Sequence, residues 1–386
     1  MNSIKPIYNR ILQANLYSTL IIVKIIGILV FDLFRDSSVD SLGIYSLAIG
    51  FTSAFFVFSG LRARVFVLAN VSGLREFLSV LFVIGALGVF ALLAVVFVYR
   101  SDQFWSTILL VSFVKYLENI LEANTSFIQK NIGRELAYKV LNIHGVIVAF
   151  TFLMLFPWLG LDIALIGEIV VLIFSICVQL IYVYSRVNES VKNSFAKGKN
   201  LVLQSSALTL AASLNAMIVT CVLYMSKFNL MNEEFLFFAK VIVLQSIFAR
   251  IVTGNNIYFQ KEADQYLSQF TKLVLVLCWG ACLLAVCLYV SEIGNDSQIL
   301  GISVLWCLLG VVFTLINISN IMIRQSILLI GAYNTLVVFH FFELLAVSLL
   351  FYFSSFNLVE SIMALILFRF VRVNYLCRKR FDYTYG

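Results

Sequence analysis

Residues 76–99 read EFLSVLFVIGALGVFALLAVVFVY, and no charged side chain follows Glu76 in this stretch. An α-helix rises 1.5 Å per residue, so about 20 residues cross the roughly 30 Å hydrocarbon core of a bilayer. A transmembrane β-strand would need only about ten residues and would alternate apolar with polar side chains. Residues 76–99 therefore predict one membrane-spanning helix.

Runs of the same kind recur along the whole chain. Of its 386 residues, 62% are hydrophobic and 12% are charged, whereas soluble domains are about half apolar and a quarter charged. This composition excludes a soluble globule and leaves room for neither a separate catalytic domain nor a disordered tail. We predict an all-α integral membrane protein with about twelve transmembrane helices. The predicted spans are residues 11–34, 41–59, 76–99, 104–120, 140–158, 161–184, 201–225, 235–258, 273–290, 299–322, 327–353 and 359–375.

The basic residues are distributed unevenly between the two sides of these spans. One set of loops and adjoining span ends holds 21 of the 27 Lys and Arg residues. Because basic loops stay in the cytoplasm, both termini are predicted to be cytoplasmic. The net charge of +7 is then explained by topology and by contact with anionic headgroups of membrane lipids, so no nucleic-acid partner is predicted.

The most polar segment between spans divides the chain nearly in half. It predicts an N-terminal six-helix lobe over residues 1–185, a basic cytoplasmic linker over residues 186–200, and a C-terminal six-helix lobe over residues 201–386. Both lobes would begin in the cytoplasm, so any repeat between them would be parallel. Transporters use this arrangement with a binding site between the halves.

Two stretches of the first half resemble bacterial polysaccharide flippases. Residues 43–64, GIYSLAIGFTSAFFVFSGLRAR, are similar to the second span and following loop of that family, which run from G-x-Y to G-L-R. Residues 115–134, KYLENILEANTSFIQKNIGR, are similar to its fourth span and loop. The chain departs from the family pattern at Asn119, where a Ser is common.

The resemblance implies an O-antigen or capsule repeat-unit flippase of the multidrug/oligosaccharidyl-lipid/polysaccharide exporter superfamily, with a MATE-like fold of two lobes around a central cavity. Such a protein would be a transporter and not an enzyme. It would move a polyprenyl-pyrophosphate-linked oligosaccharide, a precursor of lipopolysaccharide or capsule, to the periplasmic leaflet of the bacterial inner membrane by alternating access. A polysaccharide polymerase and a chain-length regulator would be its partner proteins.

A flip of this kind needs a water-filled, partly cationic cavity, because sugar hydroxyls and a pyrophosphate cannot cross hydrocarbon unpaired. Charged residues inside spans cost roughly 2.5–3.5 kcal/mol on insertion scales and usually face a cavity or a partner. Arginine at a cytoplasmic span end could also make bidentate contacts to an entering pyrophosphate. The predicted substrate-binding residues are Lys24, Lys115, Lys240, Arg62, Arg64, Arg250 and Arg324.

Each of these residues also has a structural interpretation. For Lys24 we favour cavity lining over a structural ion pair, because the residue lies too deep in its span to reach water easily. Lys115 has Glu118 one turn later, so an intrahelical pair is as good an interpretation. Lys240 could extend its stem toward the periplasmic surface. For the four arginines we favour the role of topology signals over substrate contact.

Four side chains are candidates for coupling transport to a proton or sodium gradient: Glu118, Glu168, His340 and Glu343. His340 and Glu343 lie one turn apart on one helix face, which suits either a proton-responsive pair or a satisfied core pair. No GxxxxGK[ST] loop is present, so direct ATP drive is not predicted. No cofactor and no metal site are predicted either, because the cysteines lack CxxC spacing and the chain has two histidines.

Two other classes of protein stay open at this stage. A drug or cation antiporter of the same superfamily would have a similar topology, but such proteins generally carry an acidic residue in the first span, where this chain has Lys24. An O-antigen polymerase is also a many-span protein, but usually has a long periplasmic loop with Arg or His. The periplasmic loops predicted here are short and nearly free of basic residues.

Overall fold

A computed structural model of the chain describes much of the first half and parts of the second. The described residues are 17–34, 41–60, 67, 71, 73–102, 104–186, 209–211, 213–218, 298–299, 302–303, 308–313, 315–316, 333–353, 363, 365–369, 371 and 375. The chain divides into two compact units, Met1–Ala216 and Met217–Gly386, and each unit is described by itself. Of the predicted linker 186–200, residues 187–200 lie outside the described residues, and the lobe boundary stays a prediction.

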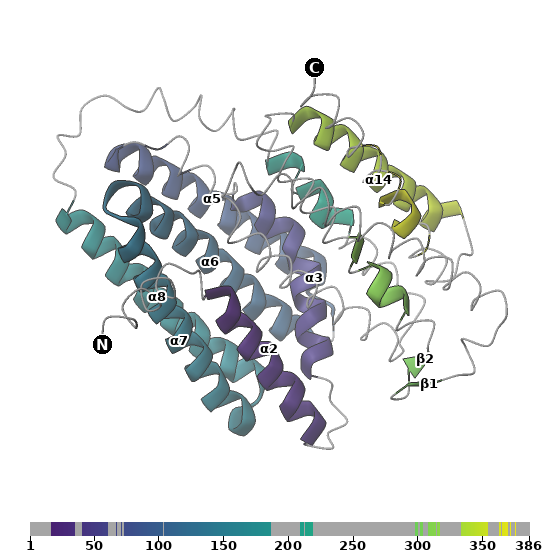
Figure 1. The fold of residues 1–386 in the computed structure, drawn as a ribbon, viewed down its shortest axis with the longest axis horizontal. Coiled ribbons are helices and arrows are strands. Elements are labelled where there is room, and N and C mark those ends of the chain that lie inside the picture. The colour runs from purple at the N-terminus through teal and green to yellow at the C-terminus, as the bar shows by residue number, and fades with distance from the viewer. Residues whose placement is uncertain are drawn as a thin grey trace, which may run out of the picture. The chain divides into compact units, whose positions relative to one another are not determined.

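The described residues are almost entirely helical, which confirms the predicted all-α class (Figure 1). The first unit contains α2 (Tyr17–Phe34), α3 (Ser41–Ser59), α5 (Leu74–Tyr99), α6 (Trp105–Asn131), α7 (Arg134–Leu159) and α8 (Leu161–Arg186), and the second contains α14 (Tyr333–Phe353).

Long apolar helices identify a multi-pass membrane protein. Four described segments are long and apolar enough to cross a bilayer: Ser41–Ser59, Leu74–Tyr99, Glu135–Leu159 and Leu161–Val183. One face of α5 exposes Phe82, Phe90 and Phe97, which are 78%, 69% and 89% exposed. Large aromatic side chains with that exposure are stable where lipid replaces water as the surrounding medium.

Helix α6 is the main correction to the predicted boundaries. The sequence predicts a span that ends at residue 120 and is followed by a loop, whereas α6 continues to Asn131. Its last three turns carry charged side chains but bury Leu121, Phe127 and Ile128, so this segment is an amphipathic helix that packs on its neighbours. By contrast, α3 occupies the predicted residues 41–59.

A proline and a glycine set the tight connection between α7 and α8. Pro157 lies inside the last turn of α7, and Gly160 follows the helix with φ of 83°, a left-handed conformation that favours glycine. The Gly160 N–H donates to the Phe156 carbonyl at 3.0 Å. Helix α8 starts at the next residue, so α7 and α8 form an antiparallel hairpin.

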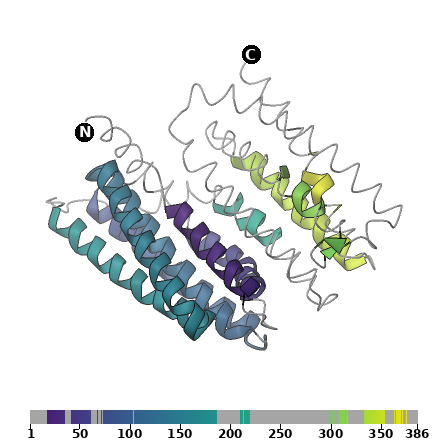
Figure 2. The same ribbon diagram turned by 60° about the horizontal axis from the view of Figure 1, so that its bottom comes forward.

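Helix α6 is the centre of the first unit. It packs against α3, α5, α7 and α8, while α2 packs on α7 and α3, and the helices of this unit run roughly along one direction (Figures 1 and 2). The hydroxyls of Ser106 and Thr107 donate to the two Asp162 carboxylate oxygens at 2.7 and 2.6 Å. The starts of α6 and α8 therefore lie on the same side, as alternating spans require.

The second unit differs from prediction at the start of the tenth span. Strand β1 (Gln298–Ile299) pairs antiparallel with β2 (Ile302–Ser303), with Gln298 opposite Ser303. The predicted helix cannot begin at residue 299, because residues 298–299 and 302–303 form these two strands. Helical residues are described there from 308 onward.

Close packing between α5 and α6 gives a first testable prediction. A Cβ added at Gly88 would overlap the Tyr116 ring, whereas a Cβ at Gly85 would meet only the Tyr116 hydroxyl at 3.8 Å, an ordinary contact. We expect Gly88→Val to lower stability by about 1–3 kcal/mol, because added volume in a packed interior forces side chains from their rotamers. Thermal unfolding of the purified protein in detergent measures the loss.

Gly85→Ala is the matched control on the same helix, and it should leave the unfolding midpoint nearly unchanged. Equal midpoints for the Gly88→Val and wild-type proteins would show that α5 and α6 are farther apart than described.

Candidate functional site

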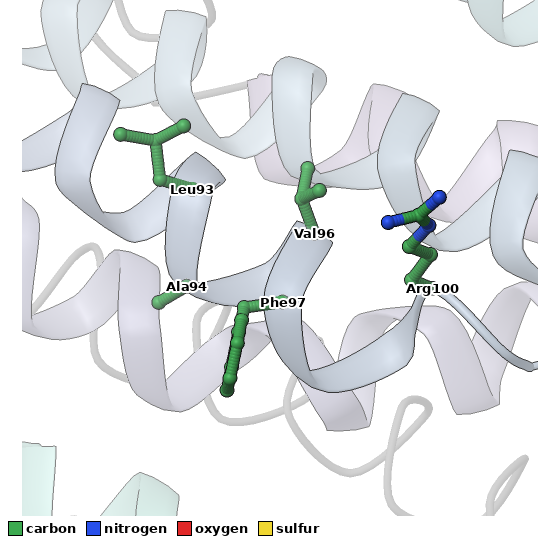
Figure 3. A pocket seen from close by; sticks show the side chains of 5 residues that line it. All are labelled: Leu93, Ala94, Val96, Phe97 and Arg100. Atoms are coloured by element: carbon green, nitrogen blue, oxygen red, sulfur yellow. The ribbon is translucent and has the colours of Figure 1, made fainter.

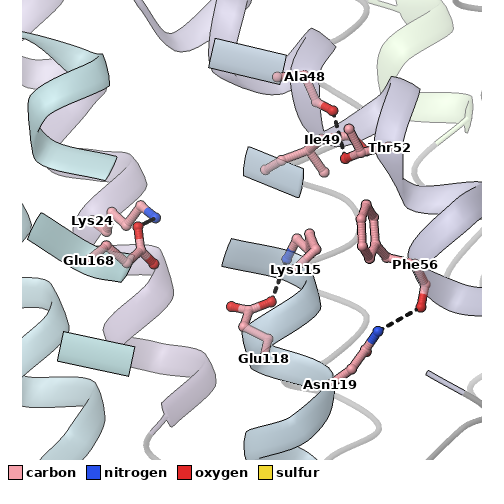
Figure 4. A network of polar contacts seen from close by, with 9 residues as sticks. All are labelled: Lys24, Ala48, Ile49, Thr52, Phe56, Lys115, Glu118, Asn119 and Glu168. Atoms are coloured by element: carbon pink, nitrogen blue, oxygen red, sulfur yellow. Dashed lines mark hydrogen bonds and ion pairs between the residues drawn. The ribbon is translucent and has the colours of Figure 1, made fainter. Parts of the chain in front are cut away.

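Two helices of the first unit join through a buried ion pair. Lys24 of α2 and Glu168 of α8 lie with 2.5 Å between Nζ and Oε2 (Figure 4). The two side chains are 4% and 5% exposed. Lys24 precedes the end of α2 by ten residues and Glu168 follows the start of α8 by seven. At 1.5 Å per residue, the pair sits about 10–15 Å from those helix ends.

This pair changes the interpretation of Lys24. The sequence favours cavity lining for this residue, and the structure instead holds its ammonium in an ion pair. Glu168 was a separate candidate in the sequence, because nothing local connects two residues 144 positions apart. A direct role for either side chain in substrate binding or ion coupling stays a prediction.

Aromatic rings from two further helices enclose the Lys24 ammonium. Its Nζ lies 4.8 Å from the ring centroid of Tyr45 on α3 and 4.6 Å from that of Phe152 on α7. Both distances fall within the range of cation–π attraction, which is stronger where water is excluded. Phe152 is fully buried and Tyr45 is 5% exposed. The ammonium is therefore a common contact of α2, α3, α7 and α8.

A second ion pair lies on α6 and is more accessible. Lys115 Nζ is 2.7 Å from Glu118 Oε2, and the two side chains are 19% and 14% exposed. This is the intrahelical pair that the sequence offered as one interpretation. Both ion pairs lie inside the first unit (Figure 4), and together we call them the polar cluster.

A further buried polar contact joins α7 and α8. His144, one of the two histidines that were too few for a metal site, lies with Nδ1 2.7 Å from Ser175 Oγ and is 2% exposed. Within the described ranges, no three His, Cys, Asp or Glu side chains come close enough together to hold a metal ion.

The two sequence stretches that resemble flippases contact each other at Asn119. Its Nδ2 donates to the Phe56 carbonyl of α3 at 2.9 Å, and the Gly60 N–H donates to the same oxygen at 3.0 Å. A side chain at Gly60 would collide with the Asn119 amide. The residue at which this chain departs from the family pattern therefore caps the end of α3, where the G-L-R segment begins.

A third charged cluster lies in the second unit. Arg369 Nε donates to Glu343 Oε1 at 2.6 Å, and His340 Nδ1 lies 3.4 Å from Glu343 Oε2. All three residues are at most 1% exposed, and the Arg369 guanidinium lies over the Phe313 ring at 5.4 Å. The three side chains form a buried cluster, whose proton response stays a prediction.

The position of Arg369 corrects one assignment of the sequence analysis. Arg369 was one of the 21 basic residues assigned to cytoplasmic loops and span ends. The structure instead buries it against Glu343, a residue in the middle of α14. The signal was available, because residues 362–371, IMALILFRFV, are apolar on both sides of Arg369. A mid-span arginine is costly in lipid and usually has a partner.

The remaining predicted site residues, Arg62, Arg64, Lys240, Arg250 and Arg324, lie outside the described residues. Their place in a cavity stays a prediction.

Two buried amides escaped the sequence analysis. Asn124 of α6 and Gln179 of α8 are 0% and 2% exposed, and neither amide has a hydrogen-bond partner among the described residues. Asn124 lies in the stretch 115–134, which the resemblance to flippases had already identified. The sequence signal for a buried amide was a polar residue followed by the residues of a buried helix face.

A hollow on α5 shares no lining residue with the ion pairs of the first unit. Leu93, Ala94, Val96, Phe97 and Arg100 line it (Figure 3). Phe97 and Leu93 are 89% and 58% exposed, so this hollow belongs to the lipid-facing surface and not to the polar cluster.

Comparison with known proteins gives the fold and a distant relative. No family model matches the chain. Over 350 residues the chain is 23% identical to the capsular polysaccharide biosynthesis protein CapF of Staphylococcus aureus, and the match covers 85% of this chain and 86% of that protein.

Two solved structures show the same fold. They are the outward-facing and inward-facing conformations of a multidrug resistance MATE family transporter of the MOP superfamily, each with a TM-score of 0.56. The identities are 11% and 10%, and the matches cover 97% and 96% of this chain, and 96% and 95% of the solved chains. The chain therefore has the fold of this MATE family transporter, as predicted.

Proposed function

We propose that this chain is a flippase for polyprenyl-pyrophosphate-linked oligosaccharide repeat units of O-antigen or capsule. The transporter fold and the capsular polysaccharide relative support this proposal together. The protein would lie in the bacterial inner membrane with both termini in the cytoplasm, and would work by alternating access. A polysaccharide polymerase and a chain-length regulator are its proposed partners.

The observation that carries this proposal is the pairing of three carboxylates inside the described spans. Glu118, Glu168 and Glu343 each pair with a lysine or arginine of the chain itself. A transporter of organic cations needs a carboxylate that is available to its substrate. Because these three are already neutralised, the described charges favour an anionic or neutral substrate head over a cation.

Lys115 is the proposed substrate contact among the described residues. Its side chain is more exposed than that of Lys24, so a pyrophosphate could replace Glu118 as its partner at a lower cost of rearrangement. Exchange of this kind would free a carboxylate to take up a proton or sodium ion, which couples transport to a gradient. Arg62, Arg64, Lys240, Arg250 and Arg324 remain proposed ligands.

Deletion of the gene tests the proposal. With radioactive sugar in the medium, the deletion strain should accumulate single lipid-linked repeat units on the cytoplasmic face of the membrane, because the polar head cannot cross hydrocarbon unaided. Restored surface glycan upon expression of the chain completes the test. Unpolymerised units attached at the cell surface would indicate a polymerase, and unchanged glycan with altered drug tolerance would indicate an antiporter.

The same strain can compare two lysines of α6. Lys115→Gln should restore less surface glycan than the wild type at equal protein abundance. Lys130→Gln is the matched control, because Lys130 is exposed at the end of the same helix. Full restoration by Lys115→Gln would remove Lys115 from the proposed binding site and leave the flippase proposal to the deletion result.

A further inference from the structure

We propose that Glu168, Tyr45 and Phe152 form a monovalent-cation site in the first unit, and that the chain fills this site with its own Lys24 ammonium. The inference concerns a site inside one unit and does not rest on the proposed function. It assigns to Lys24 the role of a tethered cation ligand, in place of a substrate contact.

The composition of the site is the first argument. A carboxylate oxygen lies 2.5 Å from the ammonium nitrogen, and two aromatic faces lie within 5 Å of it. A carboxylate combined with aromatic rings is the arrangement by which proteins bind ammonium ligands, since the rings present negative potential on their faces. Neither ring carries a formal charge, so without Lys24 the three side chains that enclose the ammonium have a net charge of −1.

The origin of the three enclosing residues is the second argument. Tyr45 belongs to α3, Phe152 to α7 and Glu168 to α8, and none of them is adjacent to another in sequence. Lys24 itself belongs to α2. The helices α3, α7 and α8 therefore make a receptor for a positive charge, and α2 carries the ligand. Such a receptor should bind a free cation of the same shape when the Lys24 side chain is removed.

The variant Lys24→Ala cuts the tether. It removes Cγ, Cδ, Cε and Nζ, which are the heavy atoms of n-propylammonium. We expect the purified full-length Lys24→Ala protein in detergent to unfold at a lower temperature than the wild type. Propylammonium chloride should then raise its unfolding midpoint saturably, by about 3 °C or more, because a ligand that binds the folded state stabilises it by mass action.

Three comparisons make this result specific to the charge of Glu168. Propylammonium should not raise the midpoint of the wild type, where Lys24 occupies the site, or that of Lys24→Ala/Glu168→Gln, where the carboxylate is gone. The neutral analogue n-propanol and the bulky tetrapropylammonium chloride should not raise the midpoint of Lys24→Ala. Lys139→Ala, which removes an exposed lysine of α7, should show no response to propylammonium.

The proposal is overturned if propylammonium leaves the Lys24→Ala midpoint unchanged, or if n-propanol or the double variant gives an equal shift. If Lys24→Ala does not accumulate as folded protein, the amount of folded Lys24→Ala/Glu168→Gln distinguishes a charge requirement from a packing requirement. Recovery of folded protein in Lys24→Ala/Glu168→Gln would support a receptor that requires a positive charge, and continued loss would show that Lys24 acts through packing alone.

Discussion

The Lys24→Glu protein is expected to be nearly absent as folded protein, whereas Lys24→Glu combined with Glu168→Lys should recover most of the wild-type amount. Removing one member of a buried ion pair costs about 3–5 kcal/mol, because the other charge stays buried without a partner. A second carboxylate at this site adds repulsion in a low dielectric. A loss of this size is a large part of the total stability of about 5–15 kcal/mol.

The measurement is the yield of monodisperse protein after gel filtration in detergent, together with its thermal unfolding midpoint. Lys139→Glu reverses the charge of an exposed lysine on α7 and serves as the control, with no expected loss. A double-mutant cycle over the four Lys24 and Glu168 proteins gives the coupling between the two residues. Similar stability of Lys24→Glu and the wild type would be incompatible with the buried pair.

Arg369→Met is expected to cause the second large loss of folding stability, in the second unit. Glu343 is fully buried and accepts a hydrogen bond from Arg369 Nε at 2.6 Å. Arg369→Met removes the 2.6 Å ion pair with Glu343 Oε1, while His340 lies 3.4 Å from Oε2 of the same carboxylate. We expect a loss of about 3–5 kcal/mol, by the same argument of an uncompensated buried charge.

The double variant Arg369→Met/Glu343→Met separates charge from volume. Replacement of a whole buried pair by apolar side chains is often neutral or stabilising, so this protein should be more stable than Arg369→Met alone. Arg369→Lys should be intermediate, because an ammonium keeps the charge but cannot reproduce the planar guanidinium that lies over Phe313. An unfolding midpoint of Arg369→Met equal to the wild type would argue against the buried cluster in this unit.

The helix ends show how far local sequence information extends. The predicted span 41–59 agrees with α3 because its apolar run has clear polar boundaries, and span length is set by the rise of a helix through hydrocarbon. The predicted end of α6, at residue 120, was wrong because residues 121–131 mix buried apolar side chains with charges. A rule that searches for apolar runs ends the span near Glu118 and Glu122, where the apolar run stops, although an amphipathic helix continues through such charges.

Arg369 shows the same limit for charges. Its assignment to a cytoplasmic span end rested on the count of basic residues, which depends on sequence alone. The carboxylate that stabilises it inside the bundle is Glu343, 26 positions away. The Asn119 contact with Gly60 and Phe56 is similar, since two stretches that resemble one family in sequence meet only when α3 and α6 pack.

The sequence by itself determined that the chain is a helical membrane protein, where most of the described spans begin and end, and that lysines and carboxylates lie inside them. These properties depend on the solvation of short segments in lipid, so each segment reports them independently. Only the tertiary structure decided that Lys24 meets Glu168 between two aromatic rings, and that Glu343 meets Arg369. Pairing depends on which helix faces pack together, and the charges of these two pairs are tolerated in the interior because packing supplies an opposite charge to each.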